Sequence, residues 1–422
     1  MKSKPTIIII GGTIWGNRGA EAMLVTTIGR IRQDFPNAEF NVFSYYPHQD
    51  SQLISDPHVH IHDGTPLSLV LNHFFGALTY KFFSLLGINL RFLKIASVLD
   101  QSDILLDIGG ITFADGREMF LPFNILSIWP AILLGTPVIK LAQAVGPFEH
   151  AFNRILARNF LSRCKHIFLR GSSSARHITR LNLPAGKTSP AADIAFLYKP
   201  AYSLSAENIP RINILLDRIQ QEKSKGKKLI IISPSILVDQ KMHKMNRNYI
   251  DLLLMALARL NRDDFFYIFM PNATREGSSK HHNNDILLVN RIMRNAEQSN
   301  LPQPLQNAIA FIDYDLNSHA IRQVTEQADL LITSRYHAMI SGLALTIPTI
   351  VIGWGHKYQE TMAAFGLSQF VLNSSDPDLD LTEMIKKALE SNPQIRKHLQ
   401  CHLPVVRQLA DNQFVAISQY LK

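Results

Sequence analysis

The sequence predicts an α/β protein with two doubly wound, Rossmann-like domains that face a cleft. Its 422 residues are too many for one ordinary hydrophobic core. Short β-branched runs alternate with helical stretches, which is typical of a parallel sheet with helices on both faces. This alternation occurs twice, on either side of a polar and charged stretch. Ligands of such folds bind at the carboxyl ends of the strands.

The first half contains a regular series of strands and helices. The run Ile7–Ile10 is too short for a secretion signal and predicts a buried first strand. The other strands are expected at 40–44, 104–108, 137–142 and 166–169, the helices at 21–35, 152–163 and 172–181, and residues 191–196 close this half. We expect an N-terminal domain over residues 1–198.

The second half repeats this pattern after a break in composition. Residues 199–228 are polar and charged, and we interpret them as a linker that contains a helix. A C-terminal Rossmann-like domain is expected over 229–403, and a helix over 404–422 that packs back on the first domain. The strands of this half are expected at 229–233, 265–270, 330–333 and 349–352, and its helices at 249–260, 284–296 and 336–345.

Composition narrows the class of partner and the location. A formal charge of +9 favours anionic partners. Basic residues are scattered and nucleic-acid-binding signatures are missing, so we expect a phosphate-bearing substrate and no nucleic acid. The two cysteines, Cys164 and Cys401, lack a paired spacing, which fits a cytoplasmic protein.

Residues 66–99 are apolar and aromatic. Gly76, Lys81 and Gly87 interrupt this segment, so it lacks the run of about 20 apolar residues that spans a bilayer. Two interpretations stay open: buried helices that pack on the sheet, or a patch that makes peripheral contact with the inner face of the cell membrane.

Two glycine-rich loops follow predicted strands of the first half. The loop 11–21 offers Gly16, Asn17 and Glu21, and its glycines would let the backbone approach an anion at the start of a helix. It matches neither a P-loop nor a dinucleotide-binding motif, and a plain tight turn explains it equally well. The loop after the strand at 104–108 offers three further candidate substrate contacts, Gly109, Gly110 and Asp115.

Polar side chains also stand at later strand ends. Gln143 and Arg170 each end a predicted strand, and Arg170 precedes a serine-rich helix start, where it could clamp an oxyanion or simply be a surface arginine. In the second half, Ser334, Arg335 and His337 open a helix whose dipole favours a bound anion. With Lys357 after the next strand, these cations would hold a phosphate and a carboxylate together.

In this order, six blocks resemble the polysaccharide pyruvyl transferase family. The blocks extend over roughly residues 7–370 and are Gly-Asn-x-Gly-x-Glu-Ala at 16–22, Asp-Ile-Gly-Gly at 107–110, Gln-x-x-Gly-Pro-Phe at 143–148, Leu-Arg-x-x-Ser at 169–173, Ser-Arg-x-His-Ala at 334–338 and Gly-x-x-x-Lys at 353–357.

The resemblance implies a glycosyltransferase-B-like fold and a specific reaction. Pyruvate would move from phosphoenolpyruvate to a sugar of a cell-surface polysaccharide, or of its lipid-linked precursor, and form a ketal without a cofactor or a metal. The N-terminal domain would take the acceptor and the C-terminal domain phosphoenolpyruvate. The family's arginines fall on Arg170 and Arg335 and its essential histidine on His337, so we expect His337 and Arg170 to be catalytic. His337 suits an acid or a base because an unperturbed imidazole has a pKa of about 6.5.

Two departures from the family pattern leave alternatives. Ala20 and Gly171 stand where the family often has aspartate. They are compatible with a non-catalytic member of a polysaccharide-synthesis complex. A second alternative is a glycosyltransferase with a nucleotide-sugar donor, in which Glu360 would hold the ribose.

Overall fold

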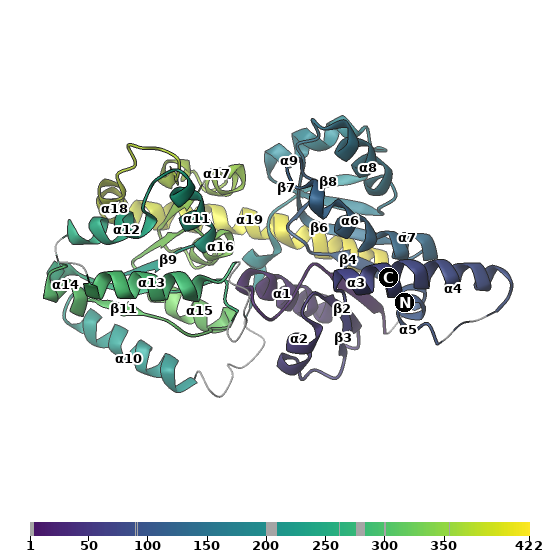
Figure 1. The fold of residues 1–422 in the computed structure, drawn as a ribbon, viewed down its shortest axis with the longest axis horizontal. Coiled ribbons are helices and arrows are strands. Elements are labelled where there is room, and N and C mark those ends of the chain that lie inside the picture. The colour runs from purple at the N-terminus through teal and green to yellow at the C-terminus, as the bar shows by residue number, and fades with distance from the viewer. Residues whose placement is uncertain are drawn as a thin grey trace. The chain divides into compact units, whose positions relative to one another are not determined.

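The structure is a computed structural model that describes residues 4–88, 90, 92–199, 209–260, 262–275, 283–298, 301–353 and 355–422. The chain divides into two compact units, each with its own parallel sheet (Figure 1). The first unit contains residues 1–15, 20–199 and 407–422, and the second contains residues 16–19 and 200–406. The predicted α/β class with two Rossmann-like domains is confirmed.

The sheet of the first unit is wound outward from its middle. Its strands lie in the order β3-β2-β1-β4-β6-β7-β8, β5 pairs with β6, and all pairs are parallel. The chain order reverses between β1 and β4, so the loops after these two strands meet at a switch point, where such folds bind ligands. The strands are β1 Thr6–Ile10, β2 Glu39–Ser44, β3 Val59–Asp63, β4 Ile104–Asp107, β5 Ile111–Thr112, β6 Val138–Val145, β7 His166–Arg170 and β8 Thr188–Ala191.

Helices cover both faces of this sheet (Figure 1). They are α1 Arg18–Asp34, α2 Pro47–Leu53, α3 Pro66–Ser68, the π-helix η1 Leu69–Phe75, α4 Gly76–Leu85, α5 Lys94–Gln101, α6 Leu121–Leu126, α7 Trp129–Leu134, α8 Ala151–Leu161 and α9 Gly171–Ile178, with short 3₁₀ turns at Glu118–Phe120, Thr179–Leu181 and Ile194–Leu197.

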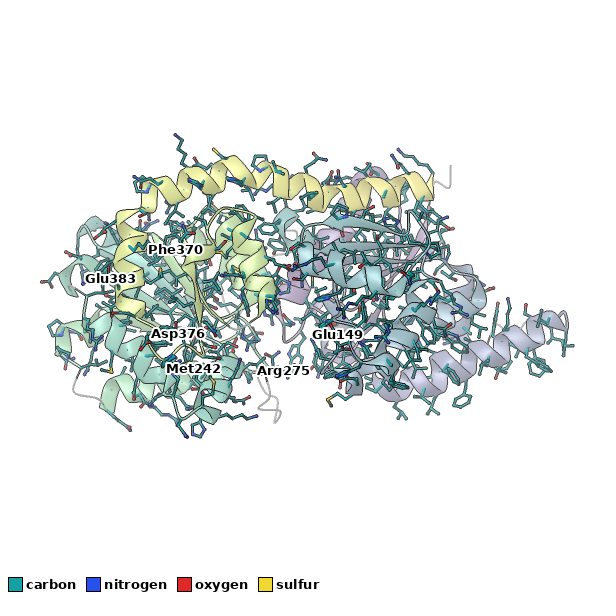
Figure 2. The ribbon with its side chains drawn as sticks, turned by 90° about the horizontal axis from the view of Figure 1, so that it is seen from above. Glu149, Met242, Arg275, Phe370, Asp376 and Glu383 are labelled. Carbon is teal, nitrogen blue, oxygen red and sulfur yellow. The ribbon has the colours of Figure 1, made fainter. Side chains whose placement is uncertain are left out.

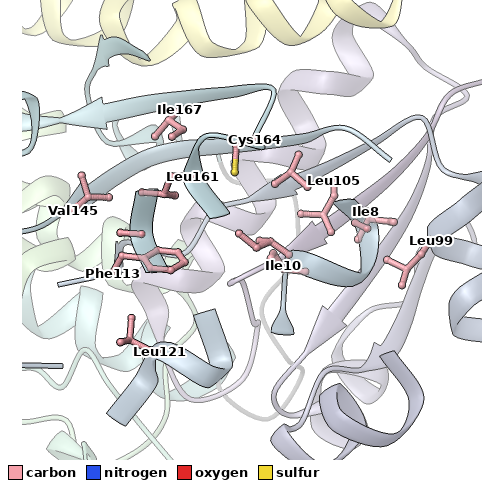
Figure 3. Packing of buried hydrophobic residues seen from close by; sticks show 14 of the residues in the cluster. Ile8, Ile10, Leu99, Leu105, Phe113, Leu121, Val145, Leu161, Cys164 and Ile167 are labelled. Atoms are coloured by element: carbon pink, nitrogen blue, oxygen red, sulfur yellow. The ribbon is translucent and has the colours of Figure 1, made fainter. Parts of the chain in front are cut away.

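The core of the first unit forms between strands and helices (Figure 3). Ile8, Leu105 and Ile167 come from β1, β4 and β7, and they belong to one core cluster with Phe113 and Leu161; all five are 0% exposed. Burial of this much apolar surface is the main favourable term in folding the unit.

The second unit repeats the winding with six parallel strands in the order β11-β10-β9-β12-β13-β14. The strands are β9 Lys228–Ser233, β10 Phe265–Phe269, β11 Ile309–Phe311, β12 Leu330–Thr333, β13 Thr349–Gly353 and β14 Val371–Asn373. The helices are α10 Ile209–Ser224, α11 Ile236–Lys244, α12 Tyr249–Ala258, α13 Asp285–Gln298, α14 Gln303–Asn307, α15 Ser318–Glu326, α16 Tyr336–Ala344, α17 His356–Ala363, α18 Leu381–Glu390 and α19 Asn392–Leu421, with 3₁₀ turns at Arg262–Asp264 and Ser368–Phe370.

Two expected boundaries differ from the structure. Helix α10 lies inside the segment interpreted as a linker, but its apolar residues Ile212, Leu215 and Ile219 are buried in the core of the second unit. This part of the segment is therefore a layer of that unit. Helix α19 begins at Asn392, earlier than the expected residue 404, and its residues from Arg407 on group with the first unit.

The apolar segment 66–99 forms helices in the first unit. Its inner residues, among them Ala77 and Tyr80, belong to the core, whereas Phe82 and Leu85 are 60% and 76% exposed. Buried helices therefore describe only one face of the segment. Across the part of the chain that the structure describes, no helix combines the length and the apolar character needed to cross a membrane.

Candidate functional site

The densest group of predicted site residues lies at the start of α16 in the second unit. Ser334 is buried directly after β12, and its Oγ shares a hydrogen bond of 2.6 Å with the hydroxyl of Tyr249. The Ser334 carbonyl accepts a hydrogen bond of 3.1 Å from the hydroxyl of Tyr358. Burial raises the pKa of Tyr358 to about 12, so this hydroxyl stays neutral and donates. Two tyrosines thus fix the residue that precedes Arg335.

Arg335 is the N-cap residue of α16, and its guanidinium is held by an acidic partner. It forms an ion pair with Asp285, whose side chain is 0% exposed, and Nη1 donates to Asn283 Oδ1 at 2.5 Å. Asp285 also accepts backbone hydrogen bonds from Ile236 and Ala273 at 3.1 and 2.9 Å. Arg335 Nε is buried and, among the described residues, has no hydrogen-bond partner. The guanidinium is therefore positioned with donor capacity left over.

His337 follows one residue into α16 and is half-buried. Its ring packs edge-on against Tyr336, with the centroids 5.3 Å apart. Residues 16–19, which group with the second unit, approach it closely: a Cβ added to Gly19 would lie 2.0 Å from His337 Nδ1. Only glycine leaves room for the histidine at this point.

The segment 16–19 is fixed in the second unit by further bonds. The guanidinium of Arg18 forms an ion pair with Asp315 at 2.9 Å, and Ser318 Oγ donates to the Arg18 carbonyl at 2.6 Å. Asn17 Oδ1 accepts from Gly19 N at 3.1 Å, which caps the first turn of α1. Gly16 has a φ of +80° and lies against Arg275, which Figure 2 labels. The predicted contact Asn17 thus fixes the turn that carries Gly19 against His337, whereas Gly16 lies against Arg275.

Lys357, on the first turn of α17, completes this group. Its Nζ lies 4.9 Å from the ring centroid of Tyr336 and 5.3 Å from that of Tyr358, which is within the range of cation–π attraction. The two rings connect Lys357 to the start of α16. The structure therefore brings together Ser334, Arg335, His337 and Lys357, as the sequence predicted for the end of β12 and the loop after β13.

A second group of predicted residues lies in the first unit, at the ends of β4, β6 and β7. Arg170 is the N-cap residue of α9 and is buried. It forms an ion pair with Asp193, and Nη2 donates to the Gly110 carbonyl at 3.3 Å. Arg170 is therefore not a surface arginine. Its role as an oxyanion clamp stays a prediction.

Gln143 holds the loop after β4 from inside. It is fully buried, and its Nε2 donates to the carbonyls of Gly109 and Leu141 at 2.5 and 3.0 Å. Its Oε1 accepts from Thr112 Oγ1 at 2.8 Å. These bonds tie the loop to β6, so in this structure the amide of Gln143 shapes the backbone around Gly109.

Gly109 and Asp115 also have structural partners. A Cβ on Gly11 would lie 2.4 Å from Gly109 N, so the loops after β1 and β4 touch at the switch point. Asp115 accepts from Glu149 N at 2.6 Å, from His150 N at 3.1 Å and from Asn153 Nδ2 at 2.7 Å. It thereby fixes the start of α8. Glu21 is buried in the first turn of α1.

One group of possible metal ligands stands out among the described residues. The ligand atoms of Asp115, Glu118 and His150 lie within 4.8 Å of one another. His150 is bonded to Glu118 at 2.6 Å, and this contact raises the pKa of the imidazole. His150 and Glu118 form an ion pair when the imidazole is protonated, and Asp115 is bonded to the backbone just before α8.

Sequence reasoning missed several residues that hold the predicted ones. Asp285 and Asp193 pair with Arg335 and Arg170 but lie far from them in the sequence. Asp50 accepts hydrogen bonds from Ile14 N and Trp15 N at 3.0 and 2.7 Å and so holds the first loop; burial raises its pKa. The only sequence signal for Asp285 is its place at the predicted start of a helix.

Comparison with known proteins places this arrangement in a family. The polysaccharide pyruvyl transferase family matches residues 17–356, which include both groups of predicted residues except Gly16 and Lys357. The chain belongs to this family. The chain is also 22% identical over 382 residues to the amylovoran biosynthesis protein AmsJ of Erwinia amylovora, with 86% of each chain covered.

Solved structures resemble this family member in fold. The UDP-GlcNAc 2-epimerase of Neisseria meningitidis superposes with a TM-score of 0.60 at 12% identity, covering 99% of this chain and 100% of the other. The trehalose 6-phosphate synthase of Burkholderia multivorans gives a TM-score of 0.55 at 10% identity, with 99% of both chains covered. The fold is thus glycosyltransferase-B-like. The family and the relative AmsJ indicate a transferase that acts in polysaccharide synthesis.

Proposed function

We propose that this protein transfers pyruvate from phosphoenolpyruvate to a sugar of a polysaccharide or of its precursor, and that the product is a cyclic ketal. The observation that carries the proposal is the group of Arg335, His337 and Lys357 at the starts of α16 and α17. It combines two fixed cations and an imidazole with the amino end of a helix, which is a favourable place for an anion. The relative AmsJ, named for amylovoran biosynthesis, supports a saccharide acceptor.

Phosphoenolpyruvate suits this group because it carries a carboxylate and a phosphate on one small enol. In the proposed reaction a proton is added to the methylene carbon, and carbon 2 becomes oxocarbenium-like. A sugar hydroxyl attacks carbon 2, the C–O bond to phosphate breaks, and a second hydroxyl of the same sugar closes the ketal. Of the two protons that the hydroxyls lose, one balances the proton added to the methylene carbon and the other leaves on the phosphate.

We assign His337 to the proton transfer and the cations to the donor. An imidazole can give or take a proton near neutral pH. Arg335 can offer the N–H groups of Nη1 and Nη2 that Asn283 and Asp285 do not use to a carboxylate or phosphate oxygen, while Asp285 keeps the guanidinium in place. Lys357 adds a second positive charge beside the tyrosine rings. No cofactor enters this proposal.

Calorimetric titration with phosphoenolpyruvate and with a panel of nucleotide sugars tests the donor. We expect phosphoenolpyruvate to bind, and Arg335→Lys to weaken binding because lysine cannot offer a planar, multidentate group. Arg291→Lys is the matched control, since Arg291 lies in the same unit and pairs with Asp239 at 2.6 Å. Binding of a nucleotide sugar but not of phosphoenolpyruvate would instead assign the glycosyltransferase reaction, in which Glu360 on α17 would hold the ribose.

A further inference from the structure

An apolar stripe runs along one side of the continuous helix formed by α3, η1 and α4. We define this apolar stripe as Leu67, Leu71, Phe75, Leu78, Phe82 and Leu85. The spacing of three or four residues keeps their side chains on one side of a helix. All six are exposed, from 38% for Leu78 to 76% for Leu85. Over about 27 Å of helix, large apolar side chains therefore stand where a surface helix normally carries polar ones.

The other side of the same helix is fixed to the first unit. Leu69, His73, Ala77 and Tyr80 are buried, and Tyr80 donates to Asp100 Oδ2 at 3.1 Å. His73 Nε2 is 2.9 Å from the carbonyl of Asp63. Figure 1 shows α4 at the edge of this unit, and side chains project along it in Figure 2. Because the other side is packed, the helix can present the stripe to another apolar phase only by lying flat against it.

The surroundings of the stripe extend the apolar surface and add positive charge. Leu86, Ile88 and Phe92 follow α4 and are 59%, 47% and 73% exposed. Between Gly64 and Leu99 the sequence contains no Asp or Glu. In this stretch Lys81 is half-buried and Lys94 is exposed, and neither forms an ion pair with any residue that the structure describes. Aromatic and leucine side chains with flanking lysines and no acids match an anionic lipid surface.

We propose that the apolar stripe, with Lys81 and Lys94, docks the protein on an anionic lipid bilayer, with the helix in the plane of the head groups. A second copy of the chain would leave these lysines facing each other, whereas a bilayer pairs them with lipid phosphates. The inference goes beyond the transfer reaction, since docking depends on this surface alone and on neither the donor nor the acceptor.

Vesicle flotation of the full chain tests the proposal, with phosphatidylglycerol-containing and pure phosphatidylcholine vesicles at low and high salt. We expect co-flotation with the anionic vesicles at low salt and release at high salt. Phe82→Ser with Leu85→Ser should lower the vesicle–water partition coefficient by about tenfold or more, because both substitutions remove apolar surface that the bilayer would bury. Lys81→Gln with Lys94→Gln should remove the preference for anionic lipid.

The matched control is Phe152→Ser with Ile155→Ser on α8. These two residues have the same spacing of three, lie in the same unit and are 67% and 66% exposed. The control should bind vesicles like the unchanged protein, and melting curves verify that all variants fold. Equal losses for the stripe and control variants, or no flotation at low salt, would overturn the proposal. Loss of a dimer in the stripe variant, with no flotation of the unchanged protein, would show instead that a second copy covers the stripe.

Discussion

The side chains of Arg335 and His337 have very different surroundings. Arg335 faces a buried carboxylate, whereas His337 lies between the ring of Tyr336 and the backbone at Gly19. The arginine is therefore fixed by charge and the histidine by packing. This difference predicts different consequences when each contact is removed.

Replacement of His337 tests its assignment to proton transfer. We expect His337→Asn to lower kcat for phosphate release from phosphoenolpyruvate by about 10²–10⁴-fold, the usual contribution of a positioned acid or base. The matched control is His243→Asn, at the exposed end of α11 in the same unit. Near-normal turnover of the His337 variant with an unchanged melting curve would assign the proton transfer to another group.

Asp285 is expected to position Arg335. Asp285→Asn leaves a buried guanidinium without its counter-charge, which should lower the free energy of unfolding by about 3–5 kcal/mol in urea titrations. It should also raise the KM for phosphoenolpyruvate more than it lowers kcat. Asp239→Asn is the comparison, because its partner Arg291 is 50% exposed and such pairs contribute about 0–1 kcal/mol. Equal destabilisation by the two variants would contradict a special role for the Asp285–Arg335 pair.

At the scale of the elements, the starts of α1 and α16 depend on each other through one glycine. Gly19 belongs to the first turn of α1, and His337 to the first turn of α16. A methyl group at Gly19 would overlap the imidazole, so the helix propensity of alanine and the packing of His337 oppose each other at this position.

This conflict can be measured with two glycines of the same helix. Gly19→Ala should lower kcat by displacing His337, since a Cβ at 2.0 Å from Nδ1 cannot be accommodated. Gly29→Ala, where nothing lies within 4 Å of the added carbon, should keep kcat and raise the free energy of unfolding by about 0.5–1 kcal/mol. Steady-state kinetics and urea titrations compare the two; normal turnover of Gly19→Ala would show that His337 does not need this space.

The strands were the most predictable elements. Apolar β-branched runs marked β1, β9 and β12 to within one residue, because strands buried on both faces are continuous apolar runs. Strand β3 was missed, since its sequence Val-His-Ile-His-Asp at 59–63 carries three ionisable residues at the edge of the sheet. The early start of α19 was missed because Pro404 suggested a helix start, whereas the structure has it inside the helix.

The sequence predicted the position of site residues only where these residues come directly after a strand. Arg335 and His337 could be placed at the start of a helix because β12 and α16 are contiguous in the sequence. Their partners could not, since Asp285 and Gly19 come from distant parts of the chain. Gln143 stays a predicted substrate contact, and its bonds to Thr112 and Gly109 inside the unit could not be predicted from the sequence.

At the scale of the whole molecule, α19 is one continuous helix that contributes residues to both units. Residues up to 406 group with the second unit and later ones with the first. In the first unit, Arg30 pairs with Asp411 at 2.5 Å, and Ser418 Oγ donates to Asp34 at 2.5 Å. The last turns of the chain are therefore part of the N-terminal unit's structure.

Gln413 is expected to be the main polar link of α19 to the first unit. It is fully buried, and its Oε1 accepts from Ala142 N at 2.8 Å at a bulge of β6, while Nε2 donates to the Ala192 carbonyl at 2.9 Å. Gln413→Ala leaves these groups unsatisfied and should cost about 1–3 kcal/mol in the free energy of unfolding. Gln408→Ala, on the exposed side of α19, should change it by less than about 0.5 kcal/mol. Equal effects of both variants on urea unfolding would refute this role.

The central claim is that phosphoenolpyruvate donates its pyruvyl group to a saccharide, and isotope tracing tests it most directly. Phosphoenolpyruvate labelled with ¹⁴C in its carbon skeleton is incubated with the protein and a panel of saccharide acceptors, free and lipid-linked. We expect the label to appear in a saccharide as an acid-labile ketal, with one phosphate released for each pyruvyl group transferred, and His337→Asn to suppress both together. Absence of label from every acceptor, with transfer from a labelled nucleotide sugar instead, would contradict the account.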